Sequence, residues 1–152
     1  MAVRILAVGK KHESWVLEGI GRYERRLKKP FDTEWILLPH SSYEGDRARE
    51  EESERLLSRI KSDDIVILLD ERGKNLSSPE LASLLLEPLE SSRQVVIIIG
   101  GAYGVDSSIH NRATTIWSLS RLVFPHQLVR LLLVEQLYRA QEISRGGAYH
   151  HS

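Results

Sequence analysis

Hydrophobic residues occur along the chain in short, almost uninterrupted runs, and each run is separated from the next by a stretch with helical periodicity or strong polarity. Runs without alternation are typical of strands buried on both faces, as in parallel sheets covered by helices. The runs that predict strands are Val3 to Val8, Thr33 to Leu38, Ile65 to Leu69, Val95 to Ile99 and Ile116 to Leu119.

The intervening stretches predict helices. Ser77, with Glu80 three positions later and Pro79 in the first turn, is typical of a capped helix start. After Leu69-Asp70 we expect a polar turn over Arg72 to Asn75. The predicted helices are Glu13 to Lys28, a solvated helix within Ser41 to Lys61, Ser77 to Glu90, a short segment around Asp106 to Thr114, and His126 to Arg145. Alternation of strand and helix favours an α/β fold, a three-layer sandwich around a mostly parallel sheet.

The last helix is hydrophobic around more than half of its circumference. Such a helix is buried on two sides, so we expect the sheet on one side and a second copy of the chain on the other. Within this helix Glu135 and Arg139 have the spacing of an ion pair.

Composition narrows the possible partners and the compartment. With 152 residues we expect one domain, residues 1–152. No apolar run is long enough for a membrane helix, and the first residues do not resemble a secretion signal. The absence of cysteine excludes thiolate metal sites and fits a cytoplasmic protein. Because 21 basic and 21 acidic residues cancel, binding to a nucleic acid would require a local basic patch.

Candidate ligand-binding residues lie where predicted strands end. Ligands of open parallel sheets bind beyond the carboxyl ends of the strands, and here those ends carry Leu69-Asp70, Gly100-Gly101 and Leu119-Ser120. Paired glycines allow a backbone to approach a ligand closely, although the same pair could form only a tight turn. The spacing matches neither a dinucleotide-binding nor a Walker motif.

Two further polar groups follow the glycines. His126 opens the last helix with Arg130 one turn later, and the last four residues are Tyr149, His150, His151 and Ser152. His126 could simply cap its helix, and the tail could be a frayed terminus or the remnant of a tag. Alternatively, the tail is a short arm that brings an aromatic ring and a titratable group to a site.

Taken in order, these segments resemble the RlmH family of SPOUT-class 23S rRNA pseudouridine N3-methyltransferases over the full length of the chain. The segments that carry the resemblance are Ile5 to Lys10, Ile98 to Gly101, Trp117 to Ser120, Phe124 to Arg130, Glu135 to Ala140 and Ala148 to His150. The resemblance implies a C-terminal trefoil knot, a homodimer, S-adenosyl-L-methionine as cofactor without a metal, and methylation of N3 of a pseudouridine in helix 69 of 23S rRNA within the assembled ribosome.

The resemblance also implies site residues. Those expected at the cofactor are Leu69, Gly100, Leu119, Ser120, Arg121, Leu122, Val123 and Phe124. Catalytic candidates are His150 and His126 for loss of the N3 proton, Tyr149 for stacking on the base and Arg130 for an anionic oxygen. His151 stands where relatives often carry arginine or lysine, which would make a phosphate contact by the tail weaker and pH-sensitive. The alternative is a non-catalytic nucleotide-sensing or ribosome-binding module, which would not require Tyr149 and His150.

Overall fold

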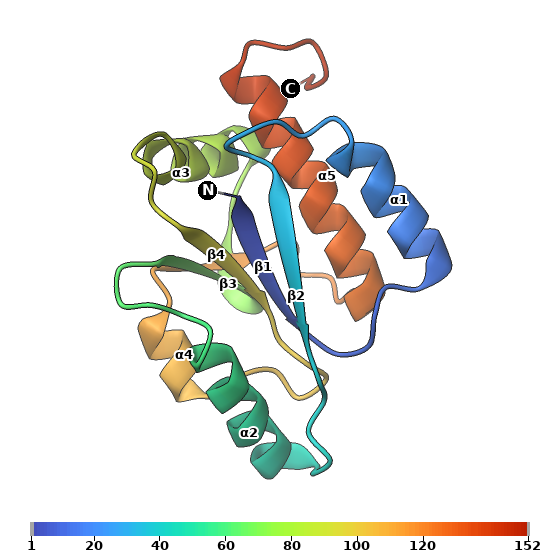
Figure 1. Ribbon diagram of the computed structural model, residues 1–152, viewed down its shortest axis with the longest axis vertical. Helices are drawn as coiled ribbons and strands as arrows, with labels where there is room; N and C mark the ends of the chain where they lie inside the picture. Colours follow the sequence, from blue (N-terminus) through green and yellow to red (C-terminus); the bar gives the residue numbers. More distant parts are fainter. Residues whose placement is uncertain (1, 152) are drawn as a thin grey trace.

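A single sheet of parallel strands organises the computed structural model, which describes residues 2–151 (Figure 1). The strand order is β2-β1-β4-β3-β5. The strands are β1 (Val3–Val8), β2 (Thr33–Leu38), β3 (Ile65–Asn75), β4 (Val95–Ile99) and β5 (Thr115–Ser118). All pairings between these strands are parallel, as the uninterrupted apolar runs predicted.

Helices cover both faces of the sheet, so the predicted three-layer α/β fold is confirmed. They are α1 (Ser14–Glu24), α2 (Gly45–Leu57), α3 (Ser78–Glu90), α4 (Ser107–Arg112) and α5 (His126–Ser144). One hydrophobic core joins α1, α3 and α5 to the sheet, and a second core joins α2 and α4 to the opposite face. Among residues 2–151, no helix is both long and apolar enough to cross a bilayer.

The start of α3 forms as its sequence predicted. The Ser77 hydroxyl accepts a hydrogen bond from the Glu80 backbone N–H at 3.2 Å, and the Glu80 carboxylate accepts one from the Ser77 N–H at 2.8 Å. This reciprocal pair satisfies two N–H groups that a helix start would otherwise leave unbonded. Hydrogen bonding of the carboxylate to the Ser77 backbone and side chain lowers the pKa of Glu80.

The predicted polar turn over Arg72 to Asn75 is wrong. β3 continues to Asn75, and after a register shift Lys74 pairs with Trp117 and Asn75 with Ser118. The apolar run stops at Leu69 because the later side chains face solvent, whereas strand pairing needs only the backbone. Gly73 marks the close approach: a Cβ there would lie 2.5 Å from the Ile116 carbonyl oxygen.

The first and last helices also differ in part from expectation. α1 ends at Glu24, because the N–H groups of Arg26 and Leu27 bond three residues back and tighten the chain out of the helix. Trp15, near the start of α1, is 52% exposed. α5 begins where expected and ends one residue earlier, at Ser144, but α1 and α3 of the same chain pack on its flanks and cover much of the apolar surface attributed to a second subunit.

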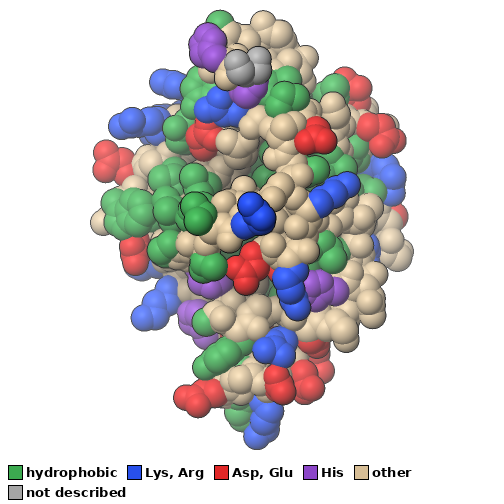
Figure 2. Space-filling view, turned by 180° about the vertical axis from the view of Figure 1, so that it is seen from behind, with side chains coloured by type: hydrophobic (Ala, Val, Ile, Leu, Met, Phe, Trp, Pro, Cys, Tyr) green, Lys and Arg blue, Asp and Glu red, His purple; other side chains and the backbone are tan. Residues whose placement is uncertain are grey.

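Some hydrophobic surface remains uncovered. Leu122 and Val123, just before α5, are 70% and 80% exposed. On the face seen from behind, hydrophobic side chains gather into a patch at mid-height, while charged side chains of both signs are mixed around it (Figure 2). On this face, therefore, no single sign of charge dominates.

Candidate active site

A cavity of about 570 Å³ opens at the carboxyl ends of β3, β4 and β5, where the rule for open parallel sheets places a ligand. Three chain segments form most of its wall: the end of β3 from Leu68 to Arg72, the glycine turn from Ile99 to Val105, and the loop after β5. Arg49 of α2 and His126 and Val129 of α5 complete it.

Most of the residues expected at the cofactor line this cavity. They are Leu69, Gly100, Leu119, Ser120, Leu122, Val123 and Phe124. Arg121 is the exception, since its side chain is exposed and it is not part of the lining. The three strand ends singled out from the sequence therefore do meet at one place.

The paired glycines form a tight turn and a cavity wall at once. Gly104 N–H donates to the Gly101 carbonyl at 3.0 Å, and Gly104 has a φ of +75°, a conformation that favours glycine. A Cβ on Gly101 would lie 2.6 Å from Oε1 of Glu52, and one on Gly100 would lie 3.1 Å from the Val105 side chain. The turn thus has no room for side chains on these two residues without movement of its surroundings.

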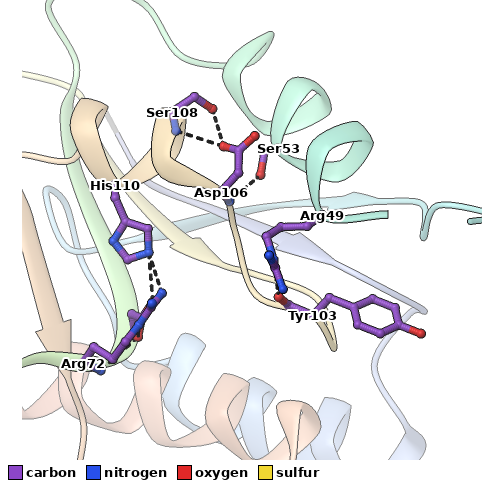
Figure 3. A network of polar contacts seen from close by, with 8 residues as sticks. Arg49, Ser53, Arg72, Tyr103, Asp106, Ser108 and His110 are labelled. Carbon is purple, nitrogen blue, oxygen red and sulfur yellow. Dashed lines mark hydrogen bonds and ion pairs between the residues drawn. The ribbon is translucent and has the colours of Figure 1, made fainter. Parts of the chain in front are cut away.

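Two contacts attach the glycine turn to α2 (Figure 3). Nε of Arg49 donates to the Tyr103 carbonyl at 2.9 Å, and the Ser53 hydroxyl accepts from the Asp106 N–H at 3.0 Å. The Asp106 carboxylate in turn caps α4 by accepting from the Ser108 N–H at 3.0 Å. The glycine turn is therefore fixed to α2 and to the start of α4 by hydrogen bonds as well as by apolar packing.

The loop after β5 is shaped by serine side chains. The Ser118 hydroxyl donates to the Ser120 carbonyl at 2.8 Å, and the Ser120 hydroxyl accepts from the Leu122 N–H at 3.0 Å. Asn75, in the extension of β3, donates to the Ser118 carbonyl at 3.1 Å. These local bonds turn the backbone so that Leu119 to Phe124, apart from Arg121, line the cavity.

His126 lines the cavity, whereas Arg130, one turn further along α5, is buried against the loop after β1. Partial burial is the main cause that lowers the pKa of His126, and the charges of Arg130 and His40 lower it further. Arg130 is 1% exposed, and its Nη1 donates to the Lys10 carbonyl at 2.8 Å. Arg130 therefore fastens the loop after β1, whereas His126 is an imidazole of lowered pKa at the cavity wall.

The tail docks on the side of α5. The Tyr149 hydroxyl donates to Oε1 of Glu135 at 3.2 Å, and Arg139 bonds the same carboxylate at 2.6 Å, the ion pair expected from their spacing. Burial of the phenol, with Tyr23 and the Glu135 charge, raises the pKa of Tyr149 to about 12. Nη1 of Arg139 donates to Nδ1 of His150 at 3.1 Å, so the neutral ring carries its proton on Nε2.

The catalytic candidates thus fall into two groups. His126 is the first residue of α5, while the tail contacts Glu135 and Arg139, which a helical rise of about 1.5 Å per residue places roughly 14–20 Å further along. Figure 1 shows the C-terminus near the far end of α5 from His126. Within one chain, the structure does not bring Tyr149 and His150 to the cavity.

Some residues of the site were not among the sequence candidates. Arg72 lines the cavity beside Asp70, which the sequence had already placed at a predicted strand end, and its position just after the apolar run of β3 was the available signal. Burial opposes ionisation of Asp70, but the hydrogen bonds and the charge of Arg72 outweigh it and lower the pKa of Asp70. Glu52 is 3% exposed and lies behind Gly101. Nothing in the sequence indicated this burial, because Glu52 belongs to a run of acidic residues that is typical of a solvated helix.

Known proteins resemble this chain over its whole length. Proteins named ribosomal RNA large subunit methyltransferase H from Geotalea daltonii and Desulfitobacterium hafniense are 42% and 40% identical, with 99% of this chain and 99–100% of theirs aligned. A solved structure of a probable methylase family protein from Haemophilus influenzae matches with a TM-score of 0.58 at 13% identity, over 99% of this chain and 70% of that one. This last match concerns the fold alone. The model of the family described as predicted SPOUT methyltransferase matches residues 1–150, and the chain belongs to the SPOUT methyltransferase family.

Proposed function

We propose that this chain methylates N3 of a pseudouridine in helix 69 of 23S rRNA, acting on the assembled ribosome. The observation that carries the proposal is the cavity at the glycine turn, in a chain about 40% identical over its full length to proteins named ribosomal RNA large subunit methyltransferase H. The choice of nucleotide and of assembled ribosomes extends beyond those names and rests on the resemblance of the motifs.

The residues of the cavity fit the methyl donor. SPOUT methyltransferases use S-adenosylmethionine, whose sulfonium supplies an activated methyl group when bound. A volume of about 570 Å³ falls within the usual range for small-molecule sites. Leu69, Leu119 and Phe124 offer apolar surface for an adenine ring, and a turn lacking side chains at Gly100 and Gly101 leaves backbone groups accessible.

Acid–base chemistry follows from the two histidines. His126, kept neutral beside the cavity, can accept the N3 proton as the methyl group is transferred. His150 receives a hydrogen bond from Arg139 on Nδ1, so its Nε2–H is a donor that can hold a base oxygen. Tyr149, with a pKa of about 12, stays a neutral phenol for stacking.

A second copy of the chain can supply the missing half of the site. The tail lies far along α5 from the cavity of its own chain, and Leu122 and Val123 on the cavity wall are largely exposed. In a two-fold dimer that buries these side chains, the tail of one subunit can reach the cavity of the other. We therefore propose a homodimer with sites shared between subunits.

We also propose that the C-terminal segment is threaded as a trefoil knot. In support, β3 pairs with Trp117 at two places, Leu69 before the register shift and Lys74 after it, so that residues 70–75 curve around β5. Stretching a single molecule from its two ends provides the test. A knotted chain stays shorter than 152 extended residues, whereas an unknotted chain reaches full length.

The proposed reaction is tested by incubating the protein with ribosomes that lack the modification and with S-adenosylmethionine carrying a labelled methyl group. Mass spectrometry of helix 69 should find the label on one pseudouridine. Free helix 69 should be a poorer substrate than assembled ribosomes or large subunits, since a protein with a net charge of zero cannot hold naked RNA by charge alone. Absence of label on any ribosomal RNA would refute the proposal.

Complementation separates a shared site from a site within one chain. Gly100→Val damages the cavity, and removal of Tyr149 to Ser152 damages the tail, so each variant alone should be inactive. Co-expression should restore activity, because random pairing leaves about a quarter of the sites with an intact cavity and an intact partner tail. If tail and cavity of one chain worked together, mixing would restore nothing.

A further inference from the structure

An exposed arginine stands at the rim of the cavity. Arg72 lies two residues after Asp70, lines the cavity, and has a side chain that is 69% exposed. Long exposed side chains ordinarily sample many rotamers, and ordering them on binding costs free energy. The contacts of Arg72 show that this side chain is already ordered.

Asp70 holds the guanidinium side-on. Its Oδ1 accepts from the backbone N–H and from Nε of Arg72, at 2.9 and 3.2 Å, and its Oδ2 accepts from Nη2 at 2.9 Å. The Asp70 side chain is only 11% exposed, so this anchor is itself fixed in the wall of the cavity. A two-pronged arginine–carboxylate contact also fixes the plane of the guanidinium.

His110 of α4 provides a second anchor, from the other side of the cavity wall (Figure 3). Its Nε2 lies 2.8 Å from Nη2 of Arg72 and 3.2 Å from Oδ2 of Asp70. Since arginine can only donate, Nε2 accepts and the imidazole is neutral in this arrangement. Among residues 2–151, Nη1 of Arg72 has no hydrogen-bond partner. The Nε–Nη2 edge of the guanidinium is therefore anchored, and the two N–H groups of Nη1 remain for a ligand.

We propose that Arg72 binds a phosphate of the substrate RNA at the mouth of the cavity, with Asp70 and His110 as its positioning residues. This inference rests on the proposed function. A chain with no net charge needs local cations to hold RNA, and the guanidinium fork suits phosphate. Glu71, which also lines the cavity, opposes an anion there, so Glu71→Gln should tighten RNA binding.

The test is the salt dependence of binding to assembled ribosomes. Each phosphate contact contributes about 0.7–0.9 to the slope of log affinity against log salt. Arg72→Gln should lower the slope by that amount and weaken binding roughly tenfold. Arg59→Gln is the matched control. Arg59 is exposed just before the amino end of β3, whereas the cavity lies at the carboxyl ends of the strands, so this variant should leave the slope unchanged.

Positioning is tested separately. His110→Ala keeps the arginine but removes one anchor, so KM for assembled ribosomes should rise while kcat stays close to wild type. His110→Gln, whose amide oxygen can accept from Nη2, should restore KM. Arg72→Lys should keep the salt slope and lose part of the affinity, because lysine keeps the charge but lacks the fork.

The outcomes are distinguishable. If wild-type protein methylates assembled ribosomes but Arg72→Gln leaves the salt slope unchanged, Arg72 makes no phosphate contact and this inference is wrong. A fall in affinity for S-adenosylmethionine with the same slope would assign Arg72 to the cofactor carboxylate and also overturn it. If wild-type protein methylates no ribosomal RNA, the proposed function itself fails.

Discussion

Replacing Gly73 by alanine should destabilise the protein by about 3 kcal/mol. A Cβ at this position would lie 2.5 Å from the Ile116 carbonyl oxygen and 2.8 Å from the Trp117 nitrogen, both backbone atoms that cannot rotate away. The strand extension would have to separate from β5. That movement removes the pairings of Lys74 and Asn75 and the side-chain hydrogen bond from Asn75 to Ser118, each worth roughly 1 kcal/mol.

Urea unfolding followed by tryptophan fluorescence measures this loss, with Trp117, 3% exposed in β5, as a reporter beside the mutation. The midpoint should fall by roughly 1–3 M, given the usual slope of about 1–3 kcal/mol per molar urea. Gly21→Ala is the control. Gly21 is helical, a Cβ there would meet only the flexible end of Arg25 at 3.4 Å, and alanine should stabilise by about 0.5–1 kcal/mol.

Protein concentration must be the same for all variants, because a dimer changes its apparent stability with concentration. A Gly73→Ala midpoint equal to wild type, with the expected increase for Gly21→Ala, would show that the strand extension moves away from β5 at no cost. The close crossing of these two segments would then contribute nothing to stability.

Three further predictions concern the site. Gly100→Val should lower the affinity for S-adenosylmethionine at least about tenfold in calorimetry while the fold is kept, since even a Cβ is 3.1 Å from the Val105 side chain; unchanged affinity would remove the glycine turn from the cofactor site. Burial is the largest cause that lowers the pKa of both His12 and His126 below 6.5. The unfolded chain therefore binds protons more readily, and the free energy of unfolding should fall as pH drops below about 6.5, less steeply in His126→Gln; equal pH profiles would contradict this. Tyr149→Phe should remove a phenol that ionises near pH 12 in an ultraviolet titration, and loss of one that ionises near 10 would mean that the tail is undocked.

Hydrophobic pattern was sufficient for the sheet and for most helix bounds. Val95–Ile99 is fully buried on both faces, and no arrangement other than a central strand accommodates five consecutive apolar residues so well. The hydrophobic pattern could not predict strand pairing that depends only on backbone hydrogen bonds. The extension of β3 to Asn75 pairs with β5 through exposed polar residues, so nothing in its composition distinguishes it from a turn.

The candidate site was predictable to the same extent. Strand ends converge in any parallel sheet, so Leu69, Gly100 and Leu119 could be placed together from topology. The position of the tail could not, because it depends on Tyr149 meeting Glu135 after the chain reverses at Gly146, which has a φ of +70°. Burial of Arg130 was equally hidden, since its partner is a backbone carbonyl more than a hundred residues away.

The order of strands in the sheet has a consequence for how quickly the chain can acquire its structure. No two neighbouring strands are joined by a hairpin: the pairings nearest in sequence join Val3 to Thr33 and Ile65 to Val95, and the central one joins Arg4 to Val96. Each contact closes a long loop before any pairing compensates for the lost chain entropy, which is the condition for slow folding. Until β1 and β4 meet, each has an unpaired edge, and all residues of the two strands except Arg4 are apolar, so we expect the incompletely folded chain to be prone to aggregation.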